Sequence, residues 1–149
     1  MPDVAWKRPL EQIAAAENLS EIKALDAFRL LEREPDAVLL DVRTTAEWDF
    51  VGVPLVEHYA QVEWRLYPDM HVNPDFLAEV RAAGITPDHA VVVMCKMGGR
   101  SREAATFLIE NGFERVHNMV DGFEGVPNDY GHRRCVNGWI AAGLPWLQC

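Results

Sequence analysis

The fold of this chain is indicated by residues 90–101, which read AVVVMCKMGGRS. The first five residues are apolar and mostly β-branched, which is typical of a strand buried on both faces of a parallel sheet. Cys95 follows at the carboxyl end of this strand, and Gly98 and Gly99 permit a tight loop. Helical spacing of apolar residues begins near Arg100. The stretch therefore predicts a strand, a loop that carries a cysteine, and a helix.

Similar units lie on either side of this stretch. Apolar runs at residues 37–42 and 116–120 predict two further strands. Helical spacing predicts one helix over residues 20–34, with Ser20 as its N-cap, and another over residues 73–84. This alternation predicts the α/β class, with an open parallel sheet flanked by helices on both faces. Ligands in that architecture bind at the carboxyl ends of the strands.

The segments between these units have less regular patterns. We expect Thr45 to cap a brief helix, residues 62–64 to add a short strand, and a last helix to run around residues 139–142. With 149 residues, the chain has the size of one domain. We therefore expect a single domain over residues 1–149, with an N-terminal extension at 1–18 and a polar loop insertion at 125–138.

Composition excludes several classes of function. The formal net charge of −9 disfavours nucleic acid as a partner, because a basic surface would be needed. Pro9, Glu11 and Glu17 interrupt the region where a signal peptide would need an apolar core. No apolar run is long enough to span a bilayer, so no membrane partner is expected. A cytoplasmic protein is the expectation from these features.

The three cysteines, Cys95, Cys135 and Cys149, lie at wide and irregular spacings. Neither a metal-binding pair nor a disulfide framework is indicated by these positions. We expect at least one free thiol, no metal and no organic cofactor.

The chemistry of the loop follows from its residue types. Glycines allow the loop to curve until its N–H groups point at one atom, and the start of a helix adds a positive end. Lys96 and Arg100 add full positive charges, so the thiolate form of Cys95 is favoured. A thiolate can take the outer sulfur of a donor and become a persulfide, which the same N–H groups then hold. The alternative is that Cys95 is a structural cysteine packed in the core.

Two segments of this sequence resemble the signatures of the rhodanese homology family. Residues 39–43, followed by Glu47 and Trp48, resemble its first signature, and residues 95–101 resemble its active-site loop. The resemblance covers about residues 19–145. Four residues separate Cys95 from Arg100, as in sulfurtransferases of this family, whereas related cysteine phosphatases have five.

This resemblance implies a single-domain sulfurtransferase in which Cys95 is the nucleophile. The sulfur donor would be thiosulfate, a polysulfide or a persulfide, and the acceptor cyanide, a thiol or a protein. A non-catalytic rhodanese module that carries sulfur or binds proteins is the alternative. The residues implied to bind the substrate are Lys96, Met97, Gly98, Gly99, Arg100 and Ser101.

The resemblance also implies supporting roles outside the loop for Asp41 and Arg43. Arg100 is expected to brace the loop or to contact the donor anion. Asp41 is expected either to contact a cation of the loop or to cap the end of its strand.

The insertion at 125–138 departs from the family pattern. It either forms a solvated loop or presents Arg133 or Arg134 to an anionic donor. A further hypothesis is that Cys135 resolves the persulfide by forming a disulfide.

Overall fold

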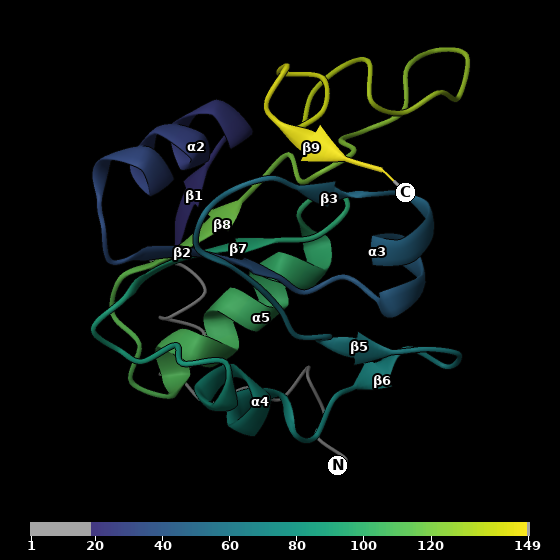
Figure 1. Ribbon diagram of the computed structural model, residues 1–149. Helices are drawn as coiled ribbons and strands as arrows, with labels where there is room; N and C mark the ends of the chain where they lie inside the picture. The colour runs from purple at the N-terminus through teal and green to yellow at the C-terminus, as the bar shows by residue number, and fades with distance from the viewer. Residues whose placement is uncertain (1–18, 149) are drawn as a thin grey trace.

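Five parallel strands form the centre of the molecule, and the sequence predicts the parallel sheet and three of these strands, β2, β7 and β8. The computed structural model describes residues 19–148. Its main sheet has the strand order β1-β8-β7-β2-β4, and every neighbouring pair is parallel (Figure 1). The strands are β1 (Ser20–Ile22), β2 (Ala37–Asp41), β4 (Tyr59–Gln61), β7 (Ala90–Met94) and β8 (Val116–Met119).

Helices cover both faces of this sheet, which confirms the expected fold class. Helix α2 (Ala24–Arg33) packs on one face, and α4 (Phe76–Ala82) and α5 (Gly99–Glu110) pack on the other (Figure 1). Successive side chains of a strand point to opposite faces. Val92 and Met94 therefore pack in the cluster that contains α2, whereas Val93 and Cys95 pack in the cluster that contains α4 and α5.

Shorter elements complete the fold around the sheet. Helix α3 (Thr45–Phe50) directly follows β2 and lies at the carboxyl edge (Figure 1). Strand β3 (Val53–Pro54) pairs with β9 (Trp146–Leu147), and β5 (Arg65–Leu66) pairs with β6 (His71–Val72), both antiparallel. The pairing of β3 with β9 returns the end of the described chain to the edge that carries α3.

Several predicted details are wrong. Ser20 is not a helix cap, because it begins β1 and pairs with His117 of β8, and α2 begins later. Residues 62–64 are not a strand, since the edge strand β4 ends just before them. Residues 139–142 form turns instead of a helix, and the cap of α3 is Thr44, one residue earlier than expected. Tertiary pairing decides such short segments more than local pattern does.

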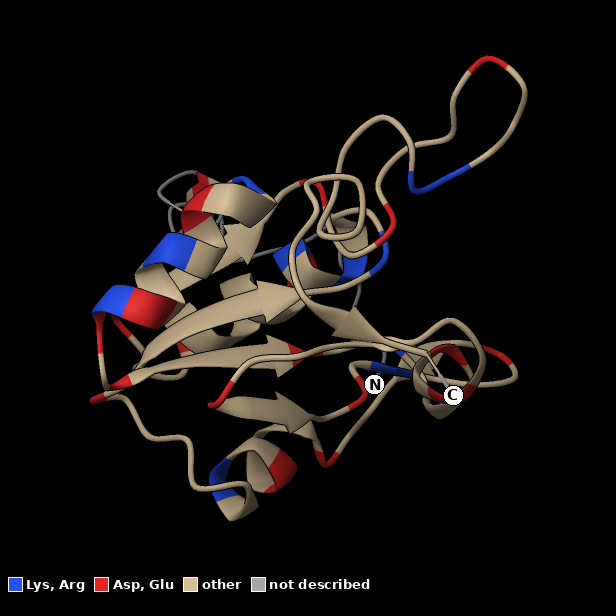
Figure 2. Cartoon of the chain, turned by 45° about the horizontal axis from the view of Figure 1, so that its top comes forward, with Lys and Arg blue, Asp and Glu red and all other residues tan. Residues whose placement is uncertain are grey.

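The insertion at 125–138 has no helix or strand. It projects from the body of the molecule, with an acidic residue near its tip and basic residues on its returning arm (Figures 1 and 2). The predicted N-terminal extension, residues 1–18, lies outside the described residues. Within residues 19–148, no helix has the length and apolar character needed to cross a membrane.

Candidate active site

Cys95 lies where β7 ends, at the carboxyl edge of the sheet. Its side chain is 1% exposed and packs with the core cluster on the side of α4 and α5. The main chain continues beside β2, because the N–H of Val42 donates to the carbonyl of Met94 at 2.9 Å. The cysteine is therefore held by the sheet on one side and by the start of α5 on the other.

Two polar groups within the next six residues contact the sulfur of Cys95. The N–H of Gly98 donates to Cys95 Sγ at 3.2 Å, and the hydroxyl of Ser101 lies 3.2 Å from the same sulfur. Gly98 has φ of 103°, a conformation that glycine adopts without strain, and the chain turns here from the loop into α5. The sulfur thus has polar partners despite its burial.

The start of α5 supplies further N–H groups next to Cys95. The first hydrogen bond of the helix runs from Arg102 N–H to the Gly98 carbonyl at 3.2 Å. The N–H groups of Gly99, Arg100 and Ser101 precede that bond and have no acceptor within the helix. Such groups favour an anion at the helix start. Of the predicted ring of N–H donors, Gly98 contacts Sγ itself, and the binding of an outer sulfur by the others stays a prediction.

A second backbone segment supports the loop from behind. The N–H of Phe123 donates to the Cys95 carbonyl at 2.9 Å, and those of Glu124 and Gly125 donate to the Lys96 carbonyl at 3.0 and 3.1 Å. This approach requires glycine at residue 122, because a Cβ there would lie 2.3 Å from the Lys96 carbonyl oxygen. Three consecutive hydrogen bonds therefore fix the first two residues of the loop.

Arg100 braces the loop, which is one of the two roles expected for it. Its guanidinium donates two hydrogen bonds to Glu47 of α3, at 2.6 and 2.9 Å. Burial raises the pKa of Glu47, but the hydrogen bonds and charge of Arg100 outweigh it and hold that pKa below its usual 4.5. The position of Glu47 is fixed by a capping box with Thr44. The Thr-x-x-Glu spacing of residues 44–47 was a signal in the sequence that could have indicated this brace.

Asp41 does not contact a cation of the loop, so that prediction is wrong. Its carboxylate accepts two hydrogen bonds from the Arg43 guanidinium, at 2.9 and 2.7 Å, and one from the Tyr59 hydroxyl at 2.6 Å. It also accepts the N–H of Arg43 at 3.2 Å, as the alternative of a strand-end cap requires. Residues 41 and 43 share the face of the sheet opposite to Cys95, because side chains alternate along a strand.

Arg43 belongs to this buried cluster as a structural residue. Both Asp41 and Arg43 are fully buried, and the guanidinium also donates to the Gly52 carbonyl at 2.9 Å. Its central carbon lies 4.3 Å from the centre of the Phe123 ring. Arg43 thus joins β2 to the segment that supports the cysteine loop, and its supporting role in the function stays a prediction.

The insertion reaches the loop through Arg133. The guanidinium of Arg133 lies 3.3 Å from Met97 Sδ and donates to the Gly125 carbonyl at 2.7 Å. Met97 is 49% exposed, so this contact lies at the surface above the loop. Arg134 points elsewhere, with its guanidinium 3.6 Å from the Glu124 carboxylate and over the ring of Trp146. Of the two arginines considered, the structure brings Arg133 to the loop.

Cys135 is an exposed free cysteine on the same insertion. Its thiol lies 3.4 Å from the Arg133 carbonyl oxygen, and no contact with Cys95 is present among the described residues. Its role as a resolving cysteine stays a hypothesis. Within residues 19–148, no cluster of three His, Cys, Asp or Glu side chains is arranged to hold a metal ion.

A buried polar chain beneath the loop was missed by the sequence analysis. The Ser101 hydroxyl donates to Asn118 Oδ1 at 2.5 Å, and Asn118 Nδ2 donates to Glu21 Oε2 at 3.1 Å and to the Gly98 carbonyl at 3.2 Å. Glu21 also pairs with Arg102 at 2.6 Å. The one signal in the sequence was a polar residue, Asn118, within the apolar run that predicts β8.

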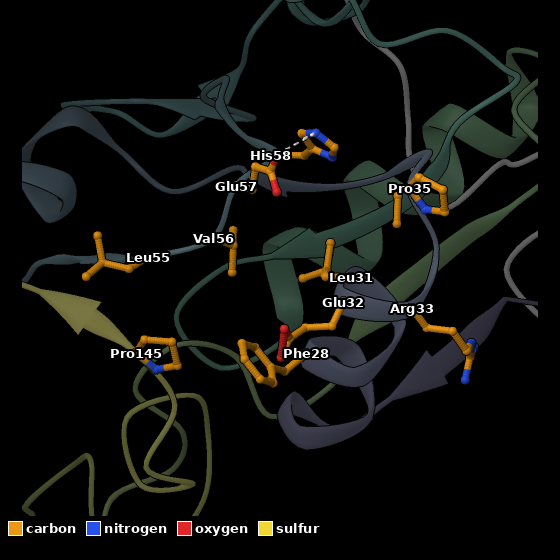
Figure 3. Close-up of a pocket in the computed structure, with 11 residues that line it drawn as sticks. Phe28, Leu31, Glu32, Arg33, Pro35, Leu55, Val56, Glu57, His58 and Pro145 are labelled. Carbon is orange, nitrogen blue, oxygen red and sulfur yellow. Dashed lines mark ion pairs between the residues drawn. The ribbon is translucent and has the colours of Figure 1, made fainter.

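A cavity of about 590 Å³ lies away from this site. It is lined by α2, by residues 55–58 and by Pro145, and none of residues 95–101 contributes to it (Figure 3). Its lining combines apolar side chains such as Leu31 and Val56 with the charged Glu32 and Glu57. Nothing in its geometry connects it with the cysteine.

The site consists of a buried cysteine in a glycine-containing loop, and an arginine five positions later braces this loop. Residues 24–129 match the family described as Rhodanese-like domain. The chain belongs to this family. Sulfurtransferases that are about 30% identical to this chain occur among its relatives, and they support a role of the sulfurtransferase type.

Known proteins resemble this rhodanese-like domain over most of its length. It is 30% identical to the thiosulfate sulfurtransferase GlpE of Actinobacillus succinogenes, over 85% of this chain and 88% of that protein. The crystal structure of Rv0390 from M. tuberculosis has a TM-score of 0.77 and 41% identity, and the match covers 87% and 98% of the two chains. The polysulfide-sulfur transferase homodimer of Wolinella succinogenes has a TM-score of 0.65 and 26% identity, with coverage of 94% and 86%.

Proposed function

We propose that this rhodanese-like domain transfers sulfane sulfur through a persulfide on Cys95. The donor is thiosulfate, a polysulfide or a persulfide, and the acceptor is cyanide or a thiol, including a thiol of a protein. The observation that carries the proposal is the position of Cys95 Sγ, which accepts the Gly98 N–H at the start of α5. Two relatives, a thiosulfate sulfurtransferase and a polysulfide-sulfur transferase, support these classes of donor.

The chemical step is a displacement at sulfur. The Cys95 thiolate attacks the outer sulfur of thiosulfate, a new S–S bond forms, the old S–S bond breaks, and sulfite leaves with the electron pair. The product is a persulfide that carries one negative charge on its terminal sulfur. An acceptor such as cyanide then attacks that sulfur, and Cys95 leaves as a thiolate. No net oxidation of the protein occurs over the cycle.

The environment of Cys95 suits both charged states of sulfur. The N–H groups at the start of α5 are fixed in place, so they stabilise negative charge without reorganising. Arg100 adds a positive charge while its bonds to Glu47 hold it at the loop. Burial excludes water from the persulfide and strengthens these interactions.

Anionic donors must reach this site on a protein with a formal net charge of −9. Local cations can provide the attraction, because charges are screened beyond about 8 Å at physiological salt. The position of Lys96 in the loop and of Arg133 beside Met97 supports this role for the two cations. We assign them to attraction of the donor, with no part in the displacement itself.

Intact-mass measurement after incubation with a sulfur donor tests the proposal. Thiosulfate, a polysulfide and glutathione persulfide should be compared, and at least one should add about 32 Da that cyanide then removes. Cys95→Ser should show no gain in mass, and Cys135→Ser should gain it normally. Absence of the added mass with every donor contradicts the proposal, and so does an unchanged gain in the Cys95→Ser protein.

A further inference from the structure

Asn118 is a fully buried polar residue in β8, beneath the cysteine loop. A buried amide is costly unless its donors and acceptor are satisfied. Three neighbours satisfy this one: the Ser101 hydroxyl, the Glu21 carboxylate and the Gly98 carbonyl. Two of these neighbours belong to the loop and helix that hold Cys95, so the amide is built into the site.

The orientation of this amide follows from the chemistry of its neighbours. A carboxylate and a carbonyl oxygen accept hydrogen bonds and cannot donate them. Glu21 and the Gly98 carbonyl must therefore face the NH₂ group of Asn118, and the amide oxygen must face Ser101. The opposite orientation would place two acceptors against the amide oxygen. The two acceptors on the NH₂ side and the hydroxyl on the oxygen side thus agree on one orientation of the amide.

This orientation determines the direction of the Ser101 proton. A serine hydroxyl has one proton, and the amide oxygen of Asn118 receives it at 2.5 Å. Toward Cys95 Sγ, at 3.2 Å, the hydroxyl then presents a lone pair. The thiol of Cys95 can donate to that lone pair, whereas a thiolate cannot.

We propose that Asn118 is a positioning residue for Cys95: it draws the Ser101 proton away from the sulfur and so stabilises the thiol over the thiolate. Ionisation of Cys95 then requires the Ser101 hydroxyl to turn from Asn118 toward the sulfur. The thiol proton leaves to water or to a base in solution, and neither Asn118 nor Glu21 gains or loses a proton. The functional meaning rests on the proposed function, in which the thiolate is the nucleophile and is regenerated in each cycle.

A titration of the thiolate by its ultraviolet absorbance tests this proposal without any sulfur donor. The signal of Cys95 is the difference from the Cys95→Ser protein, which removes the contributions of the other cysteines and the tyrosines. Asn118→Leu and Asn118→Ala both free the Ser101 proton. Each should move the midpoint to lower pH by about 0.5 to 1 unit, equivalent to a three- to tenfold higher ratio of thiolate to thiol.

A double-mutant cycle shows whether the effect passes through Ser101. In a Ser101→Ala background, Asn118→Leu should leave the midpoint unchanged, because no hydroxyl remains to be redirected. Thr106→Val is the matched control, since it removes another buried hydroxyl of α5, one that donates to the Arg102 carbonyl. This control should titrate like the original protein, and circular dichroism verifies the fold of each variant.

Two results would overturn the proposal. One is an unchanged or higher midpoint in both Asn118→Leu and Asn118→Ala. The other is an equal shift with and without the Ser101 hydroxyl, which would mean that Asn118 acts by another route. The absorbance titration requires no sulfur transfer. It therefore tests the role of Asn118 even if the protein fails to transfer sulfur.

Discussion

Glu47 and Arg100 lie 53 positions apart in the sequence and are joined by two hydrogen bonds of 2.6 and 2.9 Å. Glu47 is on α3 and Arg100 is in the first turn of α5, so this pair connects the two helices that follow β2 and β7. Their side chains are 19% and 18% exposed, and water therefore screens the pair only partly. The cysteine loop lies between β7 and α5, and its shape depends on this connection.

Glu47→Gln should weaken both stability and sulfur loading. Replacing a carboxylate that is paired and mostly buried should lower the free energy of unfolding by about 1–3 kcal/mol at neutral pH. Loss of the brace should slow persulfide formation about 10- to 100-fold. Urea denaturation and intact-mass kinetics measure these effects. Asp36→Asn, which breaks the exposed pair with Arg115, is the control and should change little.

The pH dependence of this stabilisation has a defined sign. The folded-state pKa of Glu47 is lowered, so its contribution is full above the usual value of 4.5 and is lost as pH falls through the lower folded value. The difference in stability between the original protein and Glu47→Gln should therefore shrink in acid. A difference that grew as the pH was lowered would contradict the assignment of this pair.

Gly122→Ala should be more destabilising than Gly112→Ala, although both glycines have positive φ, of 68° and 95°. A Cβ at residue 112 meets nothing within 4 Å, so the cost there is backbone strain of about 1–2 kcal/mol. A Cβ at residue 122 adds a clash with the Lys96 carbonyl, and about 2–5 kcal/mol is expected in total. Thermal denaturation measures both. Equal losses would mean that the loop backbone moves aside freely.

Arg133→Gln should raise the KM for an anionic sulfur donor by about three- to tenfold at low salt. The increase should diminish at high ionic strength, because exposed charges are then screened. Arg134→Gln is the matched control from the next position, where the guanidinium faces Glu124. Steady-state kinetics with thiosulfate or polysulfide measure both variants. If the two arginines had equal effects, the contact between Arg133 and Met97 would have no special role.

His117 should make the protein less stable in mild acid. Burial lowers its pKa below the usual 6.5, so the unfolded chain binds a proton more readily than the folded chain does. The free energy of unfolding should therefore fall as the pH decreases below the usual pKa of 6.5. His117→Gln should show a weaker dependence between about pH 7 and 5, measured by urea denaturation. The exposed His58→Gln is the control, and a matching change there would remove His117 as the cause.

The main helices and strands could be predicted because their sequence patterns are long and depend only on residues within the same segment. The β-branched run of β7 and the helical spacing of α5 identify a buried strand and a helix without knowledge of neighbours. Ser20 shows the limit of this reasoning. Its segment is three residues long, and pairing with β8, almost a hundred positions away, decides its structure. No local pattern contains that information.

The position of Cys95 at the strand end was predictable from the sequence, and the partners of its loop were less so. Cys95 and its loop are consecutive in sequence, so their proximity was certain. The partner of Arg100 depends on which nearby carboxylate faces it: Asp41 at the end of β2 pairs with Arg43, whereas Glu47 of α3 pairs with Arg100. The contact between Ser101 and Asn118 joins α5 to β8, and only the packing of a helix on a strand creates it.

The hydrogen bond from Gly125 to the Lys96 carbonyl joins the insertion directly to the cysteine loop. Gly125 is the first residue of the insertion, and Arg133 of the same insertion lies beside Met97, so the insertion contacts the cysteine loop at two places. Residues 125–138 contribute no strand to the sheet, so their length and charge can change without altering the pairing of the strands. The surface beside the cysteine loop can therefore change while the hydrogen bonds that hold Cys95 are kept.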